Sequence, residues 1–195
     1  MSLHRQLQQR AAKGRPIRVG LIGAGKFGSM YLAQVPRTPG VHLAAIADLS
    51  PDNARANLQR VGWAAERLNA TSLDDALKSG TTHLSDDWQA LVRHPAIDVV
   101  VECTGHPIAA VDHCLAAFAH GKHVVNVTVE ADAFCGPLLA RRAQEAGVVY
   151  SMAFGDQPAL ICDLVDWART CGFPVVAAGR GHKWLPHFCE STPET

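Results

Sequence analysis

The sequence predicts an α/β fold in which a mostly parallel sheet is doubly wound, with helices on both faces. Six short apolar runs alternate along the chain with segments of helical pattern. Each run is apolar on both sides, which is typical of strands buried between two layers of helices. With 195 residues, 48% of them hydrophobic, the chain is long enough for one such domain with a sizeable core.

The expected strands are the six apolar runs at residues 17–22, 41–47, 97–102, 123–127, 148–151 and 174–178. Residues typical of helix starts stand between them, namely Ser50 before Pro51, Ser72 with Asp75, Pro107 and Pro137. Residues typical of helix ends follow, namely Gly80, Gly121 and Gly147. A late apolar face at helical spacing is expected to pack on the sheet, through Leu160, Ile161, Leu164, Val165 and Ala168.

Composition favours a small-molecule substrate over a membrane or nucleic-acid partner. Basic and acidic residues balance at 18 each, and no stretch approaches the roughly 20 apolar residues that span a bilayer. Residues 1–15 lack the apolar core of a signal peptide and predict a helical extension. The six cysteines form no C-x-x-C pair or regular framework, so we expect reduced thiols and a cytoplasmic protein.

A glycine-rich turn after the first expected strand carries the main functional signal. It reads Gly-Ala-Gly-Lys-Phe-Gly and precedes a helical pattern, which is the context in which G-x-G-x-x-G binds a dinucleotide in a Rossmann-type fold. Gly23 allows the tight turn, Gly25 lets a pyrophosphate approach the backbone, and Gly28 lets the helix pack close to the strand. The expected cofactor contacts are Gly23, Ala24, Gly25, Lys26, Phe27 and Gly28.

Asp48 ends the second expected strand, 20 positions after Gly28 (48 − 28). A carboxylate there accepts hydrogen bonds from the adenosine ribose hydroxyls. It would also repel a 2′-phosphate, so we expect NAD(P) binding with a slight preference for NAD. Lys26, Arg55 and Arg60 are close enough in sequence to leave a rearranged NADP pocket open. Lys26 could contact a phosphate or only be solvated.

Polar residues also follow the next two expected strands, at the edge where open α/β sheets bind ligands. Thr104 and Gly105 are expected to line the nicotinamide, or else only to form a strand-to-helix turn. Glu130 is a candidate catalytic residue that would orient the nicotinamide ribose or a substrate hydroxyl, although helix capping explains it equally. The expected cofactor contacts here are Cys103, Thr104, Gly105, His106, Val127, Thr128 and Glu130.

Other catalytic devices are not indicated. The histidines show no H-E-x-x-H and no spacing that pairs with cysteines, so no metal is expected. No G-x-S-x-G is present, and Ser151 follows no elbow, so a Ser-His-Asp device is not expected.

With the glycine turn, residues 102–105 and residues 129–132, the chain resembles homoserine dehydrogenase-like NAD(P)-dependent oxidoreductases. Residues 147–159 and 177–186 resemble more narrowly the SAF-domain-containing branch, which includes deoxyxylulose-phosphate-reductoisomerase-like enzymes. The stretch Gly155-Asp156-Gln157-Pro158 is the most specific part. The resemblance implies a cofactor-binding first domain, followed in full-length relatives by a catalytic domain and a SAF domain.

Two departures from that family bear on the activity. Thr128-Val129 stands where homoserine dehydrogenases have Asn-Lys, so the lysine associated with their catalysis is absent and homoserine is not the first expected substrate. Thr128 and His182 also replace the branch's usual Asn and Thr, which would alter the nicotinamide contacts.

No linker interrupts the chain before Gly179, so residues 16–179 are expected to form the NAD(P)-binding domain. Residues 180–195 would begin a truncated C-terminal catalytic region, and its loss would leave an apolar patch that favours a homodimer. Lys183 in this region is a candidate catalytic residue that polarises a carbonyl, unless it is merely solvated.

Three functions fit these expectations. The first is the NAD(P)-binding domain of an oxidoreductase that transfers a hydride between nicotinamide and a small polar carbonyl or hydroxyl substrate. The second is a reductoisomerase-like enzyme acting on a sugar phosphate, which would need a divalent cation. The third is a non-catalytic NAD(P)-binding module or sensor, because nothing in the chain would enclose the nicotinamide.

Overall fold

The computed structural model describes residues 2–155, 157–179, 185–190 and 192, and it divides the chain into two compact units, Met1–Ala153 and Phe154–Thr195. This division lies earlier than the expected boundary at residue 179. The expected sixth strand, residues 174–178, has no regular secondary structure, and Val176 is 95% exposed. Pro174 has no N–H to donate to a ladder, and the run does not join the sheet.

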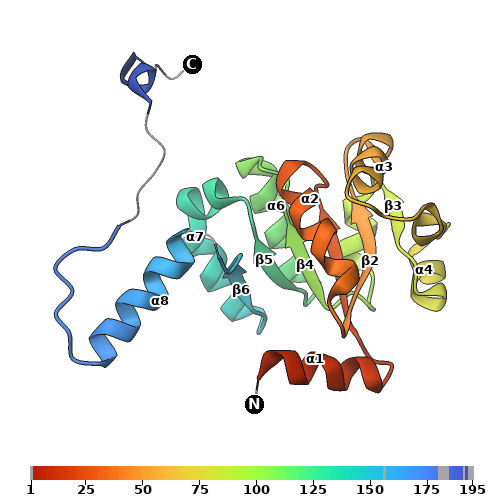
Figure 1. Cartoon of the computed structure of the whole chain (residues 1–195), viewed down its shortest axis with the longest axis horizontal. Helices are drawn as coiled ribbons and strands as arrows, with labels where there is room; N and C mark the ends of the chain where they lie inside the picture. The colour runs from red at the N-terminus through yellow and green to blue at the C-terminus, as the bar shows by residue number, and fades with distance from the viewer. Residues whose placement is uncertain (1, 156, 180–184, 191, 193–195) are drawn as a thin grey trace. The chain divides into compact units, whose positions relative to one another are not determined.

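The first unit is built on a six-stranded sheet whose neighbouring strands are all parallel (Figure 1). The spatial order is β3-β2-β1-β4-β5-β6. This is the strand order of a doubly wound Rossmann-type sheet, which confirms the predicted fold class. The strands are β1 (Ile17–Ile22), β2 (Val41–Ala47), β3 (His83–Ser85), β4 (Val99–Glu102), β5 (His123–Asn126) and β6 (Tyr150–Met152).

The helices of the first unit are α1 (Leu3–Ala12), α2 (Lys26–Gln34), α3 (Pro51–Arg60), α4 (Leu73–Ser79), α5 (Trp88–Arg93), α6 (Pro107–Ala119) and α7 (Val129–Glu145). Short 3₁₀ turns span Val35–Arg37 and Ala65–Leu68. The caps follow the sequence: the Ser72 hydroxyl accepts the Asp75 N–H at 3.1 Å, and Gly80 ends α4 with φ 75°. α7 is kinked at Cys135, whose φ −146° and ψ 26° are not helical, and Pro137 stands in the first turn after this kink, so it starts the second part of the helix as expected.

Two apolar clusters pack on the two faces of the sheet. Helices α2 and α3 cover one face, where Leu32 and Leu58 are fully buried against β1 and β2. Helices α4 to α7 cover the other face, where Leu139 and Cys114 pack against β4 and β5 (Figure 1). Because helices cover both faces of the sheet, the ends of the strands are where polar groups of the first unit are open to a ligand.

The second unit contains α8 (Gln157–Thr170) and a 3₁₀ turn at Pro186–Glu190. α8 belongs to the second unit, so the expectation that its apolar face packs on the sheet stays a prediction. Within this unit the rings of Trp167 and Phe173 lie 6.4 Å apart. Helical spacing identifies a packing face but not the surface that covers it.

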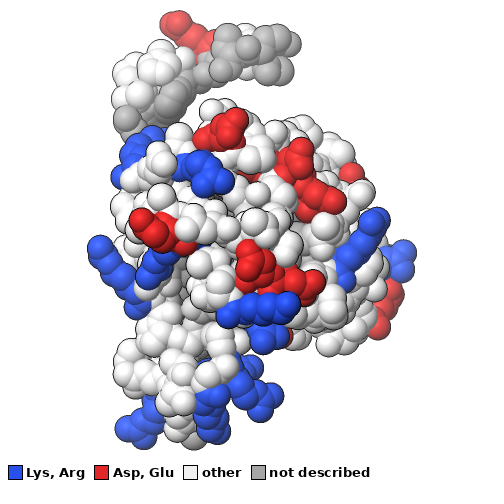
Figure 2. Space-filling view, turned by 90° about the vertical axis from the view of Figure 1, so that its right-hand side faces the viewer, with Lys and Arg blue, Asp and Glu red and all other residues white. Residues whose placement is uncertain are grey.

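Charge and hydropathy agree with the composition. Lys and Arg side chains are mixed with Asp and Glu over the middle of the face drawn in Figure 2. Among the described helices, none is long and apolar enough to cross a bilayer.

Candidate functional site

The glycine turn between β1 and α2 has the geometry that its three glycines allow. Gly23 has φ 92°, and a Cβ there would lie 2.7 Å from the Cys103 carbonyl oxygen of β4's loop. A Cβ on Gly28 would lie 2.7 Å from the Gly23 carbonyl oxygen. A Cβ on Gly25 would meet nothing within 4 Å. Gly23 and Gly28 therefore serve packing, whereas Gly25 leaves open space above the backbone.

Asp48 shapes this turn as well as facing the cleft. Its Oδ2 accepts the Ala24 N–H at 2.7 Å, and its Oδ1 accepts the Ser50 N–H at 2.9 Å. Asn57 Nδ2 on α3 donates to the Ala24 carbonyl at 3.0 Å. Both the N–H and the carbonyl of Ala24 are thus hydrogen-bonded by side chains. The sequence did not predict the contact of Asn57.

The first turn of α2 offers backbone donors to the open space at Gly25. Gly25 is the N-cap, and its carbonyl accepts both the N–H and the hydroxyl of Ser29 at 2.9 Å. The first N–H groups of a helix have no intrahelical acceptor, and they carry partial positive charge. Lys26 and Phe27 are exposed on this turn, and Arg60 Nη2 lies 3.5 Å from Ser29 Oγ.

A cleft of about 510 Å³ lies at the carboxyl ends of β1, β2 and β4, within the size range of small-molecule sites. The connections that follow β1 and β4 lead to opposite sides of the sheet, which leaves a crevice between the ends of these two strands. It brings together six of the predicted contacts: Gly23, Gly25, Asp48, Cys103, Thr104 and His106. It also has walls that the sequence did not predict, among them Leu49, Asp86, Trp88 and His113.

The remaining predicted contacts do not line this cleft. Gly28 lies beneath the turn, and Thr128 is buried behind Gly105, whose N–H it accepts at 3.0 Å. Val127 is half-buried after β5, and Glu130 is exposed on the first turn of α7. The candidate catalytic residue Lys183 lies outside the described residues, as does His182.

Glu102, the last residue of β4, is fully buried and ties the ends of β4 and β5 together. Its Oε1 accepts the Thr104 hydroxyl at 2.6 Å and the Thr104 N–H at 3.3 Å. Its Oε2 accepts the Thr128 hydroxyl. His113 Nδ1 on α6 lies 3.2 Å from Oε1, in contact that is buried on both sides. A buried carboxylate requires this number of donors, because burial without partners is costly.

The network continues past β5. Asn126 Oδ1 accepts the Thr128 N–H at 3.0 Å, and Asn126 Nδ2 donates to the Tyr150 hydroxyl oxygen at 3.0 Å. Tyr150 in turn donates to Asp132 Oδ1 at 2.9 Å. Burial raises the pKa of Tyr150 above its usual range, so this phenol keeps its proton.

A signal for the Glu102 network was present in the sequence. A carboxylate that directly ends an otherwise apolar strand, Val-Val-Val-Glu, must find partners inside the protein. The spacing between Glu102 and His113 carries no such signal, because their contact depends on how α6 packs against β4.

Burial disfavours the reactive thiolate form of the cleft cysteine. Burial, and secondarily the charge of Glu102, raise the pKa of Cys103 to about 12. Burial also raises the pKa of Cys114 to about 12. Among the described residues, no three His, Cys, Asp or Glu side chains lie close enough together to hold a metal ion.

These pKa shifts predict which thiols iodoacetamide labels in the native protein. At pH 8 a thiol of pKa about 12 has a thiolate fraction on the order of 10⁻⁴, so Cys103 is expected to label far more slowly than the exposed Cys162 and Cys171. Raising the pH to 9 should speed Cys103 about tenfold, because the thiolate is the reactive form. Peptide mass spectrometry measures each site, and the protein unfolded in urea is the control. Labelling of Cys103 at the rate of Cys162 would contradict the assignment.

The family comparison agrees with this geometry. The model of the homoserine dehydrogenase NAD-binding domain matches residues 23–152, which include the turn, Asp48 and the Glu102 network. The chain belongs to this family. Its NAD-binding domain is therefore an NAD(P)-binding oxidoreductase domain, as the resemblance implied. A second model, the catalytic domain of oxidoreductase DRL, matches residues 155–195.

Solved structures share the fold of this NAD-binding domain. A homoserine dehydrogenase from Thiobacillus denitrificans matches with 27% identity and a TM-score of 0.55, over 70% of this chain and 29% of that one. An NAD-binding oxidoreductase from Klebsiella pneumoniae matches with 23% identity and a TM-score of 0.56, over 80% and 39%. Biliverdin reductase from Synechocystis sp. PCC 6803, solved with biliverdin and NADP⁺, matches with 21% identity and a TM-score of 0.51, over 80% and 42%.

The chain thus spans well under half the length of each of these three proteins. No curated protein matches it significantly.

Proposed function

We propose that this NAD-binding domain holds NAD(P) in the cleft at the ends of β1, β2 and β4, and that it serves an oxidoreductase acting on a small polar carbonyl or hydroxyl substrate. The observation that carries the proposal is the cleft itself. Its volume is about 510 Å³, and both Gly25 and Asp48 line it. No side chain covers the backbone at Gly25, and the cleft lies between β1 and β4, where open parallel sheets bind ligands.

The residues present fit the cofactor. The N–H groups at the start of α2 would bind the pyrophosphate above Gly25, where no side chain intervenes. Each Asp48 oxygen has a second lone pair beyond the one that a backbone N–H takes, so the carboxylate can accept ribose hydroxyls. Thr104 and His106 would face the nicotinamide ring. The bound nicotinamide supplies the hydride chemistry, and the chain binds and orients it.

The same geometry supports a preference for NAD. A 2′-phosphate would lie against the Asp48 carboxylate, whose position is fixed by two backbone hydrogen bonds. Arg60, the last residue of α3, lies within 3.5 Å of Ser29 on α2. Tighter binding of NADP would instead support the rearranged pocket of Lys26, Arg55 and Arg60.

A binding titration tests both parts of this proposal. NADH and NADPH are added to the purified chain while nicotinamide fluorescence and thermal stability are followed, because a ligand of the folded state raises the apparent stability. We expect saturable binding, about tenfold tighter for NADH at low salt, with a gap that narrows as salt screens the repulsion. The control is Gly25→Ala, whose added Cβ meets no protein atom within 4 Å but occupies the pyrophosphate space.

Gly25→Ala should therefore weaken binding by at least about tenfold while the melting temperature of the free protein stays within a few degrees. If the wild-type chain binds neither dinucleotide, the proposal falls. If the variant binds as well as the wild type, the glycine turn is not the phosphate site.

Activity beyond cofactor binding is proposed from the second family match. It supports an oxidoreductase whose catalytic part begins near residue 155, and we assign it to the SAF-domain-containing branch on residues 147–159 and 177–186. A non-catalytic binding module is the competing reading. Saturable NADH binding with no turnover of any small carbonyl substrate by the chain and its full-length relative would support the module instead.

A further inference from the structure

The loop that follows β4 presents hydrogen-bond acceptors toward the cleft, because its own donors are already used. Every backbone N–H from residue 103 to residue 106 donates within the chain: Cys103 to the Ile22 carbonyl at 2.8 Å, Thr104 to Glu102 Oε1 at 3.3 Å, Gly105 to Thr128 Oγ1 at 3.0 Å, and His106 to Thr104 Oγ1 at 3.3 Å.

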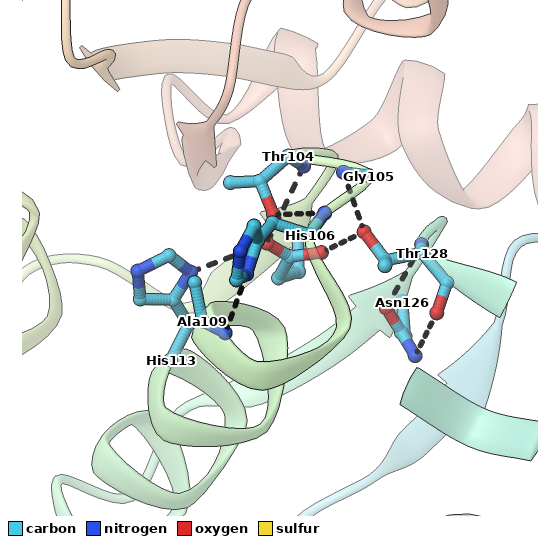
Figure 3. A network of polar contacts seen from close by, with 8 residues as sticks. Thr104, Gly105, His106, Ala109, His113, Asn126 and Thr128 are labelled. Carbon is cyan, nitrogen blue, oxygen red and sulfur yellow. Dashed lines mark hydrogen bonds and ion pairs between the residues drawn. The ribbon is translucent and has the colours of Figure 1, made fainter. Parts of the chain in front are cut away.

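The two hydroxyl groups of this edge are committed in the same way (Figure 3). The Thr104 hydroxyl donates to one oxygen of Glu102 at 2.6 Å, and the Thr128 hydroxyl donates to the other. A carboxylate can only accept, so both hydroxyl hydrogens must point at it. Thr128 is buried, whereas Thr104 is exposed and lines the cleft. The Thr104 hydroxyl oxygen can therefore offer a lone pair, but no hydrogen, to a ligand in the cleft.

One donor complements this acceptor. His106 Nδ1 accepts the Ala109 N–H at 3.3 Å, so the neutral imidazole carries its hydrogen on Nε2. His106 and Thr104 both line the cleft. A hydroxyl that accepts and an imidazole that donates, both on this edge, are together the complement of a primary amide, whose NH₂ donates and whose carbonyl oxygen accepts.

We propose that Glu102 is a positioning and specificity-determining residue for the nicotinamide end of the cofactor. By holding both threonine hydrogens, it keeps Thr104 as an acceptor, so that the edge selects the carboxamide NH₂ over a ring substituent that cannot donate. Glu102 acts through Thr104 and does not itself touch the ligand. This inference rests on the proposed function, because it assumes that a nicotinamide dinucleotide occupies the cleft.

Removing the acceptor at Glu102 should free the Thr104 hydroxyl. In Glu102→Leu no side-chain oxygen remains at this place, so the Thr104 hydroxyl hydrogen can turn toward the cleft, and the edge loses its preference for a donating substituent. Glu102→Gln is not suitable, because its amide oxygen would stay toward the Thr104 N–H and hydroxyl while its NH₂ faces Thr128.

The test compares three ligands by calorimetry in whichever series, NAD or NADP, binds more tightly. They are the oxidised dinucleotide, its 3-acetylpyridine analogue, in which a methyl group replaces the NH₂, and the matching ADP-ribose, which lacks the ring. For the wild-type chain we expect the dinucleotide to bind about fivefold more tightly than the analogue, the factor for one net hydrogen bond.

Three variants locate the cause of that preference. Thr104→Val removes the acceptor at an exposed position and should reduce the preference below about twofold, whereas Thr104→Ser keeps the hydroxyl and should retain it. Glu102→Leu should reduce the preference while binding of ADP-ribose is unchanged. If Glu102→Leu fails to fold, the two Thr104 variants decide.

Equal binding of the dinucleotide and the analogue to the wild type would overturn the inference, and so would a preference that survives Thr104→Val or a folded Glu102→Leu. In those cases ADP-ribose still binds, and the proposed function stands. If none of the three ligands binds, the proposed function falls, and this inference falls with it.

Discussion

Replacing Gly23 with alanine is expected to lower the free energy of unfolding by about 3 kcal/mol and to abolish dinucleotide binding. Gly23 has φ 92°, where an L side chain is strained by about 1–2 kcal/mol. The new Cβ would also lie 2.7 Å from the Cys103 carbonyl oxygen and 2.9 Å from Thr104 Cα, which are backbone atoms that cannot rotate away. The turn and β4 must move apart, and the phosphate site moves with them.

Urea unfolding measures this loss, and Gly121→Ala separates its two causes. Gly121 has φ 68°, but a Cβ there meets nothing within 4 Å, so its substitution carries only the conformational strain of about 1–2 kcal/mol. A loss at Gly23 no larger than the loss at Gly121 would show that β4 does not constrain the turn.

Replacing Glu102 with leucine is expected to lower the free energy of unfolding by about 3–5 kcal/mol. Leucine fills much of the same volume, so the loss comes from the donors that are left without an acceptor. These are the buried hydroxyl of Thr128, the hydroxyl and N–H of Thr104, and the ring of His113.

The matched control is Glu130→Leu. Glu130 is exposed on the first turn of α7, where a carboxylate contributes less than about 1 kcal/mol through the helix dipole. Urea unfolding of both variants, with the same probe, gives the comparison. Similar losses for the two would mean that water replaces the carboxylate in the network, and that the ends of β4 and β5 are held by other contacts.

The sheet was predictable where the strands are long and buried on both faces. The bounds of β1 and β2 agree with the expected runs, because each run is six or seven residues long and apolar except for one position near its start, Arg18 or His42. β3 was missed, since His-Leu-Ser is short and polar and is a strand only because it pairs with β2. The strand predicted at residues 174–178 does not form, because this apolar run pairs with no strand.

The candidate site divides similarly. Gly23, Gly25 and Asp48 were predictable because their spacing lies within one strand-helix-strand unit, from β1 to the end of β2. The contacts of Asn57 with Ala24 and of His113 with Glu102 join residues 33 and 11 positions apart, and each depends on how a helix packs against the sheet. Periodicity predicts that such helices exist, but it does not predict their rotation about their own axes.

The double attachment of Asp48 has an evolutionary consequence. The carboxylate that the proposed function gives to the ribose is also the one that holds Ala24 and Ser50. A descendant that came to prefer NADP would have to give up this carboxylate to admit a phosphate, and its glycine turn would loosen in the same step. Replacing Asp48 therefore costs the turn two hydrogen bonds, unless another side chain comes to accept the N–H groups of Ala24 and Ser50.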